Sequence, residues 1–523
     1  MIVSDQLHKA ARLYGNAIAA ICDDESRTIA ELEERSNRLA NALCARGLKP
    51  GDRVATWMEN SIRCVEVDFA LAKAGIIRVS INPRLTPREA QYICQDSDAR
   101  CLIYGASFDD HVGIATEDAP LIEFRVRAAE DSSASVSDAL DFEEFVATGT
   151  SEAPGWKGDG EAIYCLFYTS GTTGRPKGVM LSHRAILQVS WSLLMEVGPI
   201  ALGEKVLLMQ PLSHGAGFFV LPQLMKGGCS VIMRNFDPAE TLRLAAVHDI
   251  EVIKLIPTML QRILRVPDVE NFKLPKLRSM IYGASPMPAE PLKRAIEVFG
   301  PGKLVQIYGQ SECPVTLSIL PAEDHRLDQP FPDRLLSAGR PWSNVEMRVI
   351  DEHGNDLPAG GIGEVALRGA HMMSGYWKRE DLAAETIRDG WLCTKDMGRF
   401  DEHGYIYLLG RKDEMIITGG YNVAPREVED VLYQHAGVQE AAVVGEPDEE
   451  WGQAVVAYVV LREGFEAAHS ELLGFGREQL GFKRPKRVYL MAELPKNAAG
   501  KIQKSALKPS ISLACLGGEG KKA

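Results

Sequence analysis

The sequence lacks several features that would each define a class of protein. Its ten cysteines are scattered from Cys22 to Cys515 without a C-x-x-C pair, which argues against a zinc site or a disulfide framework and favours free thiols in a reducing compartment. Its eleven histidines include no H-E-x-x-H metal motif. No apolar run is long enough to span a membrane, and the N-terminus has no signal-peptide pattern. We therefore expect a cytoplasmic protein without a transmembrane segment.

The chain also has little positive charge. It carries 58 Lys and Arg against 71 Asp and Glu, a net charge of −13, which argues against nucleic acid as a partner because phosphate backbones are held by basic surfaces. A small anionic substrate needs only a local positive patch and stays compatible with this charge. At 523 residues the chain is too long for one compact core, so we expect several domains. The sequence leaves the oligomeric state open, a homodimer included.

Helix and strand signals alternate along the first two thirds of the chain. Thr28 and Glu31 form a capping box for a helix to about residue 46, and Asn60 or Ser61 begins an apolar helix that ends at Gly75. Strands are predicted at residues 53–58, 77–81, 206–208, 230–233, 252–256, 279–282 and 304–308. This rhythm predicts an α/β protein with mostly parallel sheets covered by helices.

The remaining segments differ from this pattern. The acidic Ser/Ala stretch at 128–144 is expected to form a solvated surface loop. Turn signals become dense after residue 351, which predicts a β-rich subdomain at about 335–411. From residue 412 the pattern is that of a small α+β domain. We expect a large N-terminal domain over residues 1–411 and a small mobile domain over 412–523.

Glycines and hydroxyl side chains are concentrated in the segment YTSGTTGRPKGV at residues 168–179. A buried strand is expected before it at 162–167 and a second strand after it at 178–181, where Ser182 offers the N-cap of a helix. Glycines allow positive φ angles, so that successive N–H groups can turn inward and bind an anion, and Lys177 adds a mobile positive charge. The segment is not a Walker A motif, because nothing matches G-x-x-x-x-G-K-[ST]. Taken alone, it predicts either a polyphosphate site or a plain turn.

Three more polar loops follow predicted strands, at residues 211–215, 283–286 and 308–312. In open α/β sheets, ligands bind at the carboxyl ends of the strands. These loops are therefore candidates to surround one site together with the Gly/Thr-rich segment.

Seven motifs occur in the order and spacing of the adenylate-forming superfamily, and the chain resembles its acyl-CoA synthetases, luciferases and peptide-synthetase adenylation domains. They are YTSGTTGRPKGV at 168, GASPM at 283, YGQSE at 308, GEVALRG at 363, KDMGRFDEHGYIYLLGRKDE at 395, GGYNVAPREVE at 419 and PKNAAGK at 495. The resemblance covers nearly the whole chain. It is closest to acyl-CoA synthetases of the fatty-acid or aryl-CoA ligase type.

The resemblance implies a two-step reaction. A carboxylate attacks the α-phosphorus of ATP, which releases pyrophosphate and leaves an acyl-adenylate; the thiol of coenzyme A then displaces AMP. The first step brings an anionic nucleophile to an anionic polyphosphate, so catalysis should consist mainly of charge neutralisation and positioning. ATP, Mg²⁺ and coenzyme A are the implied cofactors and substrates.

The resemblance also implies roles for individual residues. Lys501 would approach the reacting carboxylate and the α-phosphate, His214 would guard the carboxylate pocket, and Glu312 would hold Mg²⁺. Asp413 matches the hinge about which the small domain rotates, and Ser311 stands where the family usually has Thr. The phosphate-binding set is Thr169, Ser170, Gly171, Thr172, Thr173, Gly174 and Lys177. The adenine- and ribose-binding set is Gly283, Ala284, Ser285, Tyr308, Gly309, Asp396 and Arg411.

The acid itself is defined only in part. The loop at 211–218 contains no carboxylate, which disfavours an amino-acid substrate because a buried ammonium group needs a counter-charge. The segment after His214, at 218–221, is apolar and favours a fatty, aryl or alicyclic monocarboxylic acid. A basic cluster at 483–487 is either a contact for the phosphates of coenzyme A or a solvated face.

Three alternatives stay open. The acceptor could be a carrier protein instead of coenzyme A, the enzyme could catalyse an oxygenation as luciferase does, or the chain could be a relative that only binds nucleotide. The joint presence of Lys177, Glu312, Asp396 and Lys501 argues against the last.

Overall fold

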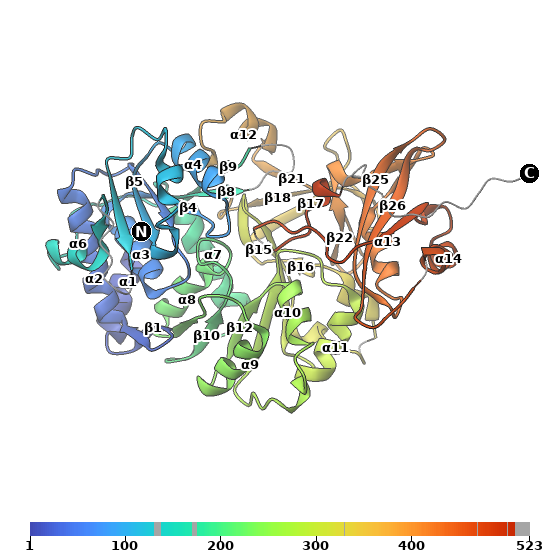
Figure 1. Cartoon of the computed structure of the whole chain (residues 1–523), viewed down its shortest axis with the longest axis horizontal. Helices are drawn as coiled ribbons and strands as arrows, with labels where there is room; N and C mark the ends of the chain where they lie inside the picture. The colour runs from blue at the N-terminus through green and yellow to red at the C-terminus, as the bar shows by residue number, and fades with distance from the viewer. Residues whose placement is uncertain (130–137, 170–174, 329, 468, 499, 508–523) are drawn as a thin grey trace, which may run out of the picture. The chain divides into compact units, whose positions relative to one another are not determined.

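The computed structural model describes residues 1–129, 138–169, 175–328, 330–467, 469–498 and 500–507 (Figure 1). The chain divides into two compact units, Met1–Leu408 and Leu409–Ala523, here called unit 1 and unit 2. The described cysteines are all free thiols. No helix among the described residues combines the length and the apolar character that crossing a membrane requires.

One large sheet of unit 1 has eight strands in the order β19-β9-β8-β4-β3-β5-β6-β7. Their bounds are β3 Arg53–Trp57, β4 Ile77–Ile81, β5 Ala99–Gly105, β6 Phe124–Ala128, β7 Leu140–Asp141, β8 Ile163–Thr169, β9 Lys177–Ser182 and β19 Gly375–Tyr376. Every pair from β8 to β7 is parallel, whereas β9 pairs antiparallel with β8 and with β19.

The second large sheet has nine strands in the order β16-β15-β14-β13-β12-β10-β11-β1-β2. Their bounds are β1 Ile18–Cys22, β2 Glu25–Thr28, β10 Lys205–Leu208, β11 Cys229–Ile232, β12 Val252–Leu255, β13 Ser279–Gly283, β14 Leu304–Gln310, β15 Cys313–Leu320 and β16 Arg340–Pro341. The six central strands pair in parallel, and the outer strands pair antiparallel. The predicted α/β class with mostly parallel sheets is confirmed.

The largest core cluster of unit 1 is built from both sheets and from helices α1 (Val3–Tyr14), α3 (Ile62–Ala74), α7 (His183–Glu196) and α8 (Val220–Met225). Figure 1 shows α7 and α8 between the two sheets. The other helices of unit 1 with seven or more residues are α2 Ile29–Ala45, α4 Pro87–Asp96, α6 Phe142–Thr148, α9 Pro238–Val247, α10 Pro257–Ile263, α11 Ala289–Phe299 and α12 Glu380–Thr386. The space between the two sheets is therefore filled by the apolar core of unit 1.

Both predicted helix starts are confirmed, and for the second helix the structure decides which of the two candidate residues is the N-cap. Thr28 and Glu31 form the capping box of α2. Ser61, not Asn60, is the N-cap of α3, which ends at Gly75 with a φ of 68°. The Asn60 side chain instead accepts a hydrogen bond from the backbone N–H of Leu212 (2.8 Å) and donates to the carbonyl of Gln210 (2.9 Å). Asn60 thereby holds the loop that leads to His214.

The expectation of a solvated loop at 128–144 is wrong for its C-terminal part. Residues 130–137 lie outside the described residues, but β7 and α6 begin within the segment. The Asp141 carboxylate accepts from the N–H groups of Glu143 and Glu144 (2.9 and 3.0 Å) and so caps α6. Phe142 is fully buried. Burial of the aromatic residues, which the acidic composition obscured, decides the structure here.

A five-stranded sheet follows, with the path β17-β18-β21-β20 and β22 beside β21. The strands are β17 Val345–Ile350, β18 Gly363–Gly369, β20 Ile387–Arg388, β21 Trp391–Phe400 and β22 Ile406–Arg411. Two Asp-Glu-His-Gly turns connect strands of this sheet, one beginning at Asp351 and the other at Asp401. In both, the Asp carboxylate accepts hydrogen bonds from the backbone N–H groups two and four residues ahead. The predicted β-rich part thus consists of antiparallel pairs joined by Asp-initiated turns.

Unit 2 is an α+β fold. Its sheet has the path β24-β23-β26-β25, with β27 parallel to β26. The elements are β23 Ile416–Thr418, β24 Tyr421–Val423, α13 Pro425–Leu432, β25 Val438–Asp448, β26 Gly452–Leu461, α14 His469–Leu480 and β27 Arg487–Leu490. Gly419 and Gly420 both have positive φ angles (56° and 82°) and form the two-residue turn between β23 and β24.

Candidate functional site

The two ends of the Gly/Thr-rich segment lie side by side. Thr169, the last residue of β8, pairs across the ladder with Lys177, the first residue of β9. The segment is therefore the connection of an antiparallel pair, as the two flanking strand predictions implied. Gly178 packs tightly, because a Cβ there would lie 3.1 Å from the Tyr168 ring and 3.3 Å from Trp377. The predicted phosphate-binding residues Ser170, Gly171, Thr172, Thr173 and Gly174 lie outside the described residues.

Lys177 lies in a cluster of charges. Burial lowers the pKa of its ammonium group, and Lys395 lowers it further, whereas Glu312 opposes both. The ammonium group lies 5.8 Å from the ring centroid of Tyr376. The Tyr376 hydroxyl in turn donates to Oε1 of Glu312 at 2.7 Å. The structure thus brings together Lys177 and Glu312, two residues far apart in the sequence, through a tyrosine that sequence reasoning missed.

Tyr376 owes its position to strand pairing. It lies in β19, which pairs with β9 so that Tyr376 faces Val179 across the ladder. The backbone N–H of Met373 also donates to the Glu312 carbonyl at 2.7 Å. No local sequence pattern distinguishes Tyr376 from a core aromatic, because its role depends on a contact between distant segments.

Glu312 can accept a cation. Tyr376 engages Oε1, so within the described part of the chain Oε2 keeps its lone pairs for a ligand. The described residues contain no cluster of three or more His, Cys, Asp or Glu side chains that could hold a metal ion. One carboxylate beside a polyphosphate suits Mg²⁺, which commonly takes one or two protein carboxylates together with substrate phosphates and water.

Tyr308 and Asp396 meet directly, since the Tyr308 hydroxyl donates to the Asp396 carboxylate. Tyr308 lies in β14 and Asp396 in β21. The residue before Asp396, Lys395, has a φ of 60°, a left-handed conformation that is uncommon for a residue with a side chain. Its N–H donates to Glu364 (3.1 Å), and that of Asp396 donates to Oγ1 of Thr394 (3.0 Å). These contacts fix the carboxylate that was predicted to bind ribose.

The YGQSE motif at 308–312 was expected to be a loop, but β14 continues through it to Gln310. Gln310 pairs with Cys313, so Ser311 and Glu312 form the tip of the antiparallel hairpin β14–β15. Gly309 must be glycine, because a Cβ there would lie 2.4 Å from the Val315 nitrogen. The GAS motif ends the neighbouring strand, with Gly283 beside Ile307 and Ala284 at a φ of 74°. Ser285 follows, so the predicted adenine-binding residues gather at one edge of the sheet.

His214 lies beside β8, the strand that precedes the Gly/Thr-rich segment. Its ring centroid is 4.9 Å from that of Phe167 in β8, and Oγ of Ser213 is 3.3 Å from its Nδ1. The loop that carries it follows β10 and is held by Asn60 as described above. His214 thus joins the two large sheets at the point where β8 approaches the site.

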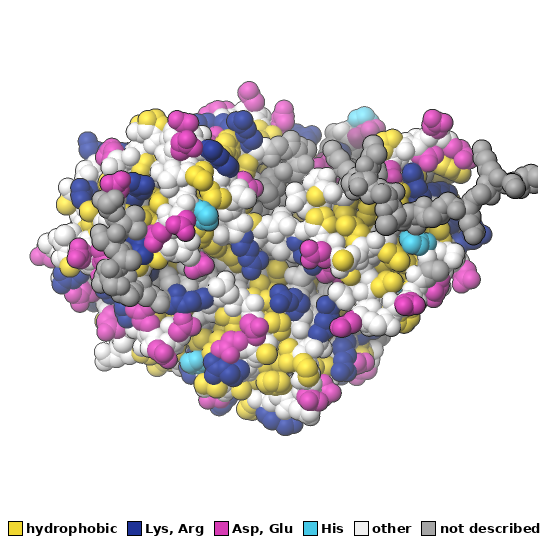
Figure 2. Space-filling view, in the orientation of Figure 1, with side chains coloured by type: hydrophobic (Ala, Val, Ile, Leu, Met, Phe, Trp, Pro, Cys, Tyr) yellow, Lys and Arg dark blue, Asp and Glu magenta, His cyan; other side chains and the backbone are white. Residues whose placement is uncertain are grey.

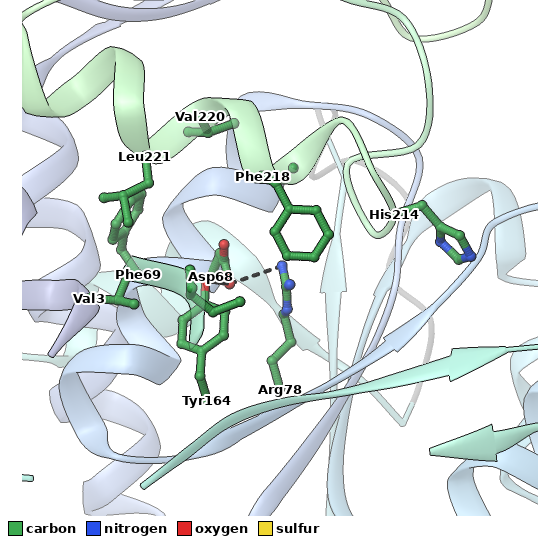
Figure 3. Close-up of a pocket in the computed structure, with 11 residues that line it drawn as sticks. Val3, Asp68, Phe69, Arg78, Tyr164, His214, Phe218, Val220 and Leu221 are labelled. Atoms are coloured by element: carbon green, nitrogen blue, oxygen red, sulfur yellow. Dashed lines mark hydrogen bonds and ion pairs between the residues drawn. The ribbon is translucent and has the colours of Figure 1, made fainter. Parts of the chain in front are cut away.

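A cavity extends from His214 (Figure 3). Its lining residues are Val3, Asp68, Phe69, Arg78, Tyr164, Ile186, His214, Gly217, Phe218, Val220 and Leu221. Three residues of the apolar segment after His214, Phe218, Val220 and Leu221, belong to this lining. The lining also contains an ion pair between Arg78 and Asp68, with Nη1 and Oδ1 2.9 Å apart.

Three predicted residues belong to unit 2. Lys501 is exposed on a turn in which its N–H donates to Oδ1 of Asn497 (3.0 Å) and the Asn497 N–H donates to its carbonyl (2.8 Å). Gly500 in that turn has a φ of 80°. Arg411 and Asp413 flank the end of β22, with Nε and Oδ1 3.9 Å apart. The expected actions of Lys501 on the reacting carboxylate, of Arg411 near ribose and of Asp413 as a hinge stay predictions.

Two of the four charges in the basic cluster at 483–487 are paired with carboxylates of unit 2. Lys483 pairs with Glu427 at 2.6 Å, and Arg487 lies 3.5 Å from Glu446. The Lys486 ammonium group lies 4.3 Å from the Trp451 ring centroid. Acidic and basic side chains are likewise interspersed on the face of the molecule drawn in Figure 2.

Comparison with known proteins identifies relatives over nearly the whole chain. The family model of AMP-binding enzymes matches residues 7–377, and that of the AMP-binding enzyme C-terminal domain matches residues 427–501. A fatty acid–[acyl-carrier-protein] ligase ScoC of Streptomyces coeruleorubidus is 36% identical over 94% of this chain and 92% of its own. A feruloyl-CoA synthase of an Amycolatopsis species is 34% identical over 96% of this chain and 97% of its own.

Among solved structures, the amide bond synthetase McbA from Marinactinospora thermotolerans is similar with a TM-score of 0.86 at 28% identity, over 96% of this chain and 99% of that one. By their names, the first of these relatives joins a fatty acid to a carrier protein, the second forms feruloyl-CoA and the third forms an amide bond. They share the fold of the whole chain and differ in the group that receives the acid.

Proposed function

Because the chain belongs to the AMP-binding enzymes, the adenylate-forming family, and is an enzyme of acyl-CoA synthetase type, we propose that it converts an apolar carboxylic acid to an acyl-adenylate and then to an acyl-CoA. The observation that carries the proposal is the convergence of Lys177, Glu312 and the Tyr308–Asp396 pair in unit 1. The cavity that starts at His214 supplies the adjoining space for the acid.

In this proposal the Tyr308–Asp396 pair orients the nucleoside. A carboxylate offers about four acceptor positions, so Asp396 can accept the ribose hydroxyls while Tyr308 occupies one position. Because the surrounding hydrogen bonds fix Asp396 before the nucleotide arrives, little rearrangement is needed on binding.

Lys177 and Glu312 would act on the phosphates. Lys177 would place a positive charge beside the departing pyrophosphate. Its pKa is lowered, but the amine donates N–H hydrogen bonds whether or not it is protonated. Glu312 would hold Mg²⁺, whose charge would offset that of the phosphate oxygens. Tyr376 keeps the Glu312 carboxylate turned toward the end of β9 and so fixes the distance between these two opposite charges.

The acid would enter the cavity with its carboxylate at His214. Asp68 lines this cavity, but it is engaged by Arg78 and by the Tyr164 hydroxyl (2.5 Å) and so provides no spare counter-charge for an ammonium group. An amino acid stays disfavoured for this reason. A fatty, aryl or alicyclic acid fits the apolar lining.

A carrier protein is the second candidate acceptor, and two observations favour it. The relative with 36% identity is named a fatty acid–[acyl-carrier-protein] ligase. In the basic cluster at 483–487, a candidate contact for the phosphates of coenzyme A, Lys483 and Arg487 are paired with acidic side chains of unit 2, and Lys486 lies over the Trp451 ring.

A two-stage assay tests the proposal. Exchange of labelled pyrophosphate into ATP is measured with fatty, aryl and alicyclic acids in the absence of an acceptor, and AMP release is then measured with coenzyme A or with a phosphopantetheinylated carrier protein. We expect acid-dependent exchange and AMP release that requires coenzyme A. AMP release with the carrier protein alone would favour the second candidate. Absence of exchange with every acid would contradict the adenylation step.

A further inference from the structure

An ion pair lies within the cavity that begins at His214 (Figure 3). Arg78 of β4 meets Asp68 of α3, and the Tyr164 hydroxyl donates to the same Asp68 oxygen at 2.5 Å. Burial raises the pKa of Tyr164, so its hydroxyl keeps the proton that it donates. Moving two charges out of water is costly, and their attraction offsets this cost only when further hydrogen bonds satisfy both partners. An ion pair in a cavity whose other lining residues are mostly apolar is therefore costly, and its presence calls for an explanation.

Asp68 is well satisfied, whereas Arg78 has donors to spare. A guanidinium group carries five N–H donors, and the partners of Arg78 are the Asp68 carboxylate, with Oδ1 2.9 Å from Nη1, and the Cys165 thiol. The Tyr164 ring centroid lies 5.5 Å from the guanidinium carbon. The Nε group of Arg78 is buried and has no hydrogen-bond acceptor among the described residues. The protein thus supplies fewer acceptors to this guanidinium than it has donors.

Arg78 is also placed to meet a ligand. It lines the cavity that begins at His214 and an adjoining cavity bounded by Thr56, Cys64 and Ser213. Its side chain keeps 12% of its surface exposed. In Figure 3, Arg78 and Phe218 lie between His214 on one side and Val3 and Leu221 on the other. A substrate that enters at His214 would pass the guanidinium group before it reaches Val3 and Leu221.

We propose that Arg78 hydrogen-bonds an uncharged oxygen acceptor, such as a keto group, on the body of the acid substrate. This inference rests on the proposed function, because it places the reacting carboxylate at the His214 end of the same cavity. The substrate class becomes that of apolar monocarboxylic acids with one oxygen function remote from the carboxylate. Arg78 is then a specificity-determining residue, and Asp68 and Tyr164 hold its orientation.

Charge decides between a neutral and an ionised acceptor. Asp68 already balances the charge of Arg78, so a second carboxylate on the substrate would bring an unpaired negative charge into apolar surroundings. A keto oxygen accepts a hydrogen bond from the guanidinium group without adding charge. We therefore expect keto acids to be preferred over plain acids, and plain acids over dicarboxylic acids.

A panel of eight-carbon acids tests this order. Pyrophosphate exchange and AMP release are measured with octanoate, with oxooctanoates whose carbonyl is moved one carbon at a time, and with suberate. We expect kcat/KM to exceed that for octanoate by roughly tenfold to a hundredfold at one or two adjacent carbonyl positions, since a hydrogen bond to a charged group has this value. Suberate should be the poorest substrate.

Other outcomes overturn the inference in distinguishable ways. Activity with octanoate that no carbonyl position improves, or a preference for suberate, would overturn the role of Arg78 and leave the proposed function standing. Absence of exchange with every acid of the panel and of the wider set would overturn both.

A matched pair of double variants separates recognition from structural support. Asp68→Asn with Arg78→Met removes both charges, which avoids leaving one of them buried without a partner. Asp109→Asn with Arg127→Met removes a comparable pair whose arginine lies in β6 of the same sheet. Nη2 of Arg127 and Oδ2 of Asp109 are 2.7 Å apart, and neither residue lines the cavity. Thermal unfolding of both variants is measured alongside the assays.

The measured quantity is the ratio of kcat/KM for the best oxooctanoate to that for octanoate. We expect this ratio to fall to about one in the first double variant, because the hydrogen bond is lost, and to keep its wild-type value in the second. The single variant Arg78→Lys, which keeps the charge but loses the planar arrangement of donors, should give an intermediate ratio. An unchanged ratio in the first double variant, or an equal change in both, would overturn the inference.

Discussion

The two units differ in how they hold the residues expected to act on the substrates. In unit 1, Glu312 and Asp396 are each fixed by a tyrosine from another strand. In unit 2, Lys501 is exposed on a turn in which the side-chain oxygen and the backbone N–H of Asn497 bond to the Lys501 backbone. Fixed side chains suit the binding of one nucleotide in one orientation. An exposed turn suits a residue that approaches in one step and leaves before the next, because its departure breaks no core contacts.

Among the variants considered, Lys501→Ala should change the rate of adenylation most, and it tests the role assigned to unit 2. Loss of a donor that stabilises transition-state charge costs roughly a hundredfold to a thousandfold in rate. We expect a loss of this size in pyrophosphate exchange, with little change in the reaction of presynthesised acyl-adenylate with the acceptor. Lys496→Ala on the same hairpin, where Lys496 pairs with Glu440 at 2.7 Å, is the matched control. Equal loss in both half-reactions would remove the assignment of Lys501 to one step.

Glu312→Gln tests the role of a side chain that unit 1 holds in a fixed position. The amide keeps the hydrogen bond from Tyr376 but loses the charge that would hold Mg²⁺. We expect exchange to fall on the order of a hundredfold and the Mg²⁺ concentration for half-maximal rate to rise. Titration of Mg²⁺ in the exchange assay measures both. An unchanged Mg²⁺ dependence would mean that Glu312 does not hold the metal.

A buried lysine in unit 1 and a half-buried lysine in unit 2 extend the comparison to stability. Lys254 in β12 is buried, and burial lowers its pKa to about 7; its ammonium group donates to the Leu255 carbonyl and lies 5.8 Å from the Phe219 ring centroid. In unit 2, Lys504 pairs with Glu429 at 2.7 Å, and although burial alone would lower its pKa, Glu429 and Glu414 raise it. Unit 1 thus surrounds Lys254 with an aromatic ring and a backbone carbonyl, whereas unit 2 surrounds Lys504 with carboxylates.

The sign of the pH effect follows from these pKa shifts. Between pH 7 and the ordinary lysine pKa, the unfolded chain binds the Lys254 proton more tightly than the folded protein does, so stability rises with pH in this window. We expect Lys254→Met to raise the free energy of unfolding of unit 1 by roughly 1–3 kcal/mol at neutral pH and to flatten this rise. Lys504→Met should instead destabilise unit 2, since it leaves two carboxylates unpaired. Denaturant unfolding at a series of pH values measures both; a destabilised Lys254→Met protein would contradict the account.

Tyr376→Phe should give the smallest effect on activity. It removes the hydrogen bond to Oε1 of Glu312 but keeps the carboxylate and the aromatic ring beside Lys177. The loss of one hydrogen bond to a charged group that only orients another residue corresponds to a severalfold change in exchange rate, about 1 kcal/mol. The rise in the Mg²⁺ requirement should be smaller than in Glu312→Gln. A loss as large as that of Glu312→Gln would place Tyr376 itself in contact with the reacting groups.

The residues that could be predicted from sequence are those whose signal is local. The Thr28–Glu31 box, the Gly75 helix end and the strands on either side of the phosphate segment depend on neighbours within a few residues, and the structure contains them. Glu312 and Asp396 were found because each lies within a contiguous motif.

The residues that were missed depend on contacts between distant segments. Tyr376 reaches Glu312 through the pairing of β19 with β9, and Asn60 holds a loop some 150 residues away. Arg78 and Asp68 lie on a strand and a helix that otherwise show ordinary apolar patterns, so nothing local indicates that their side chains meet in a cavity. Helix α6 was missed because the acidic composition of its surroundings outweighed two buried phenylalanines. Local patterns record how the backbone is built, whereas these contacts exist only after folding.

Transfer of labelled oxygen tests the central claim most directly. The acid is supplied with heavy oxygen in both positions of its carboxylate, and the AMP formed in one turnover is analysed by mass spectrometry. Attack of the carboxylate on the α-phosphorus leaves one heavy oxygen atom on the phosphate of AMP when the acceptor takes the acyl group. We predict AMP that carries one labelled oxygen. Unlabelled AMP, formed while the acid is consumed, would contradict an acyl-adenylate and with it the roles proposed for both units.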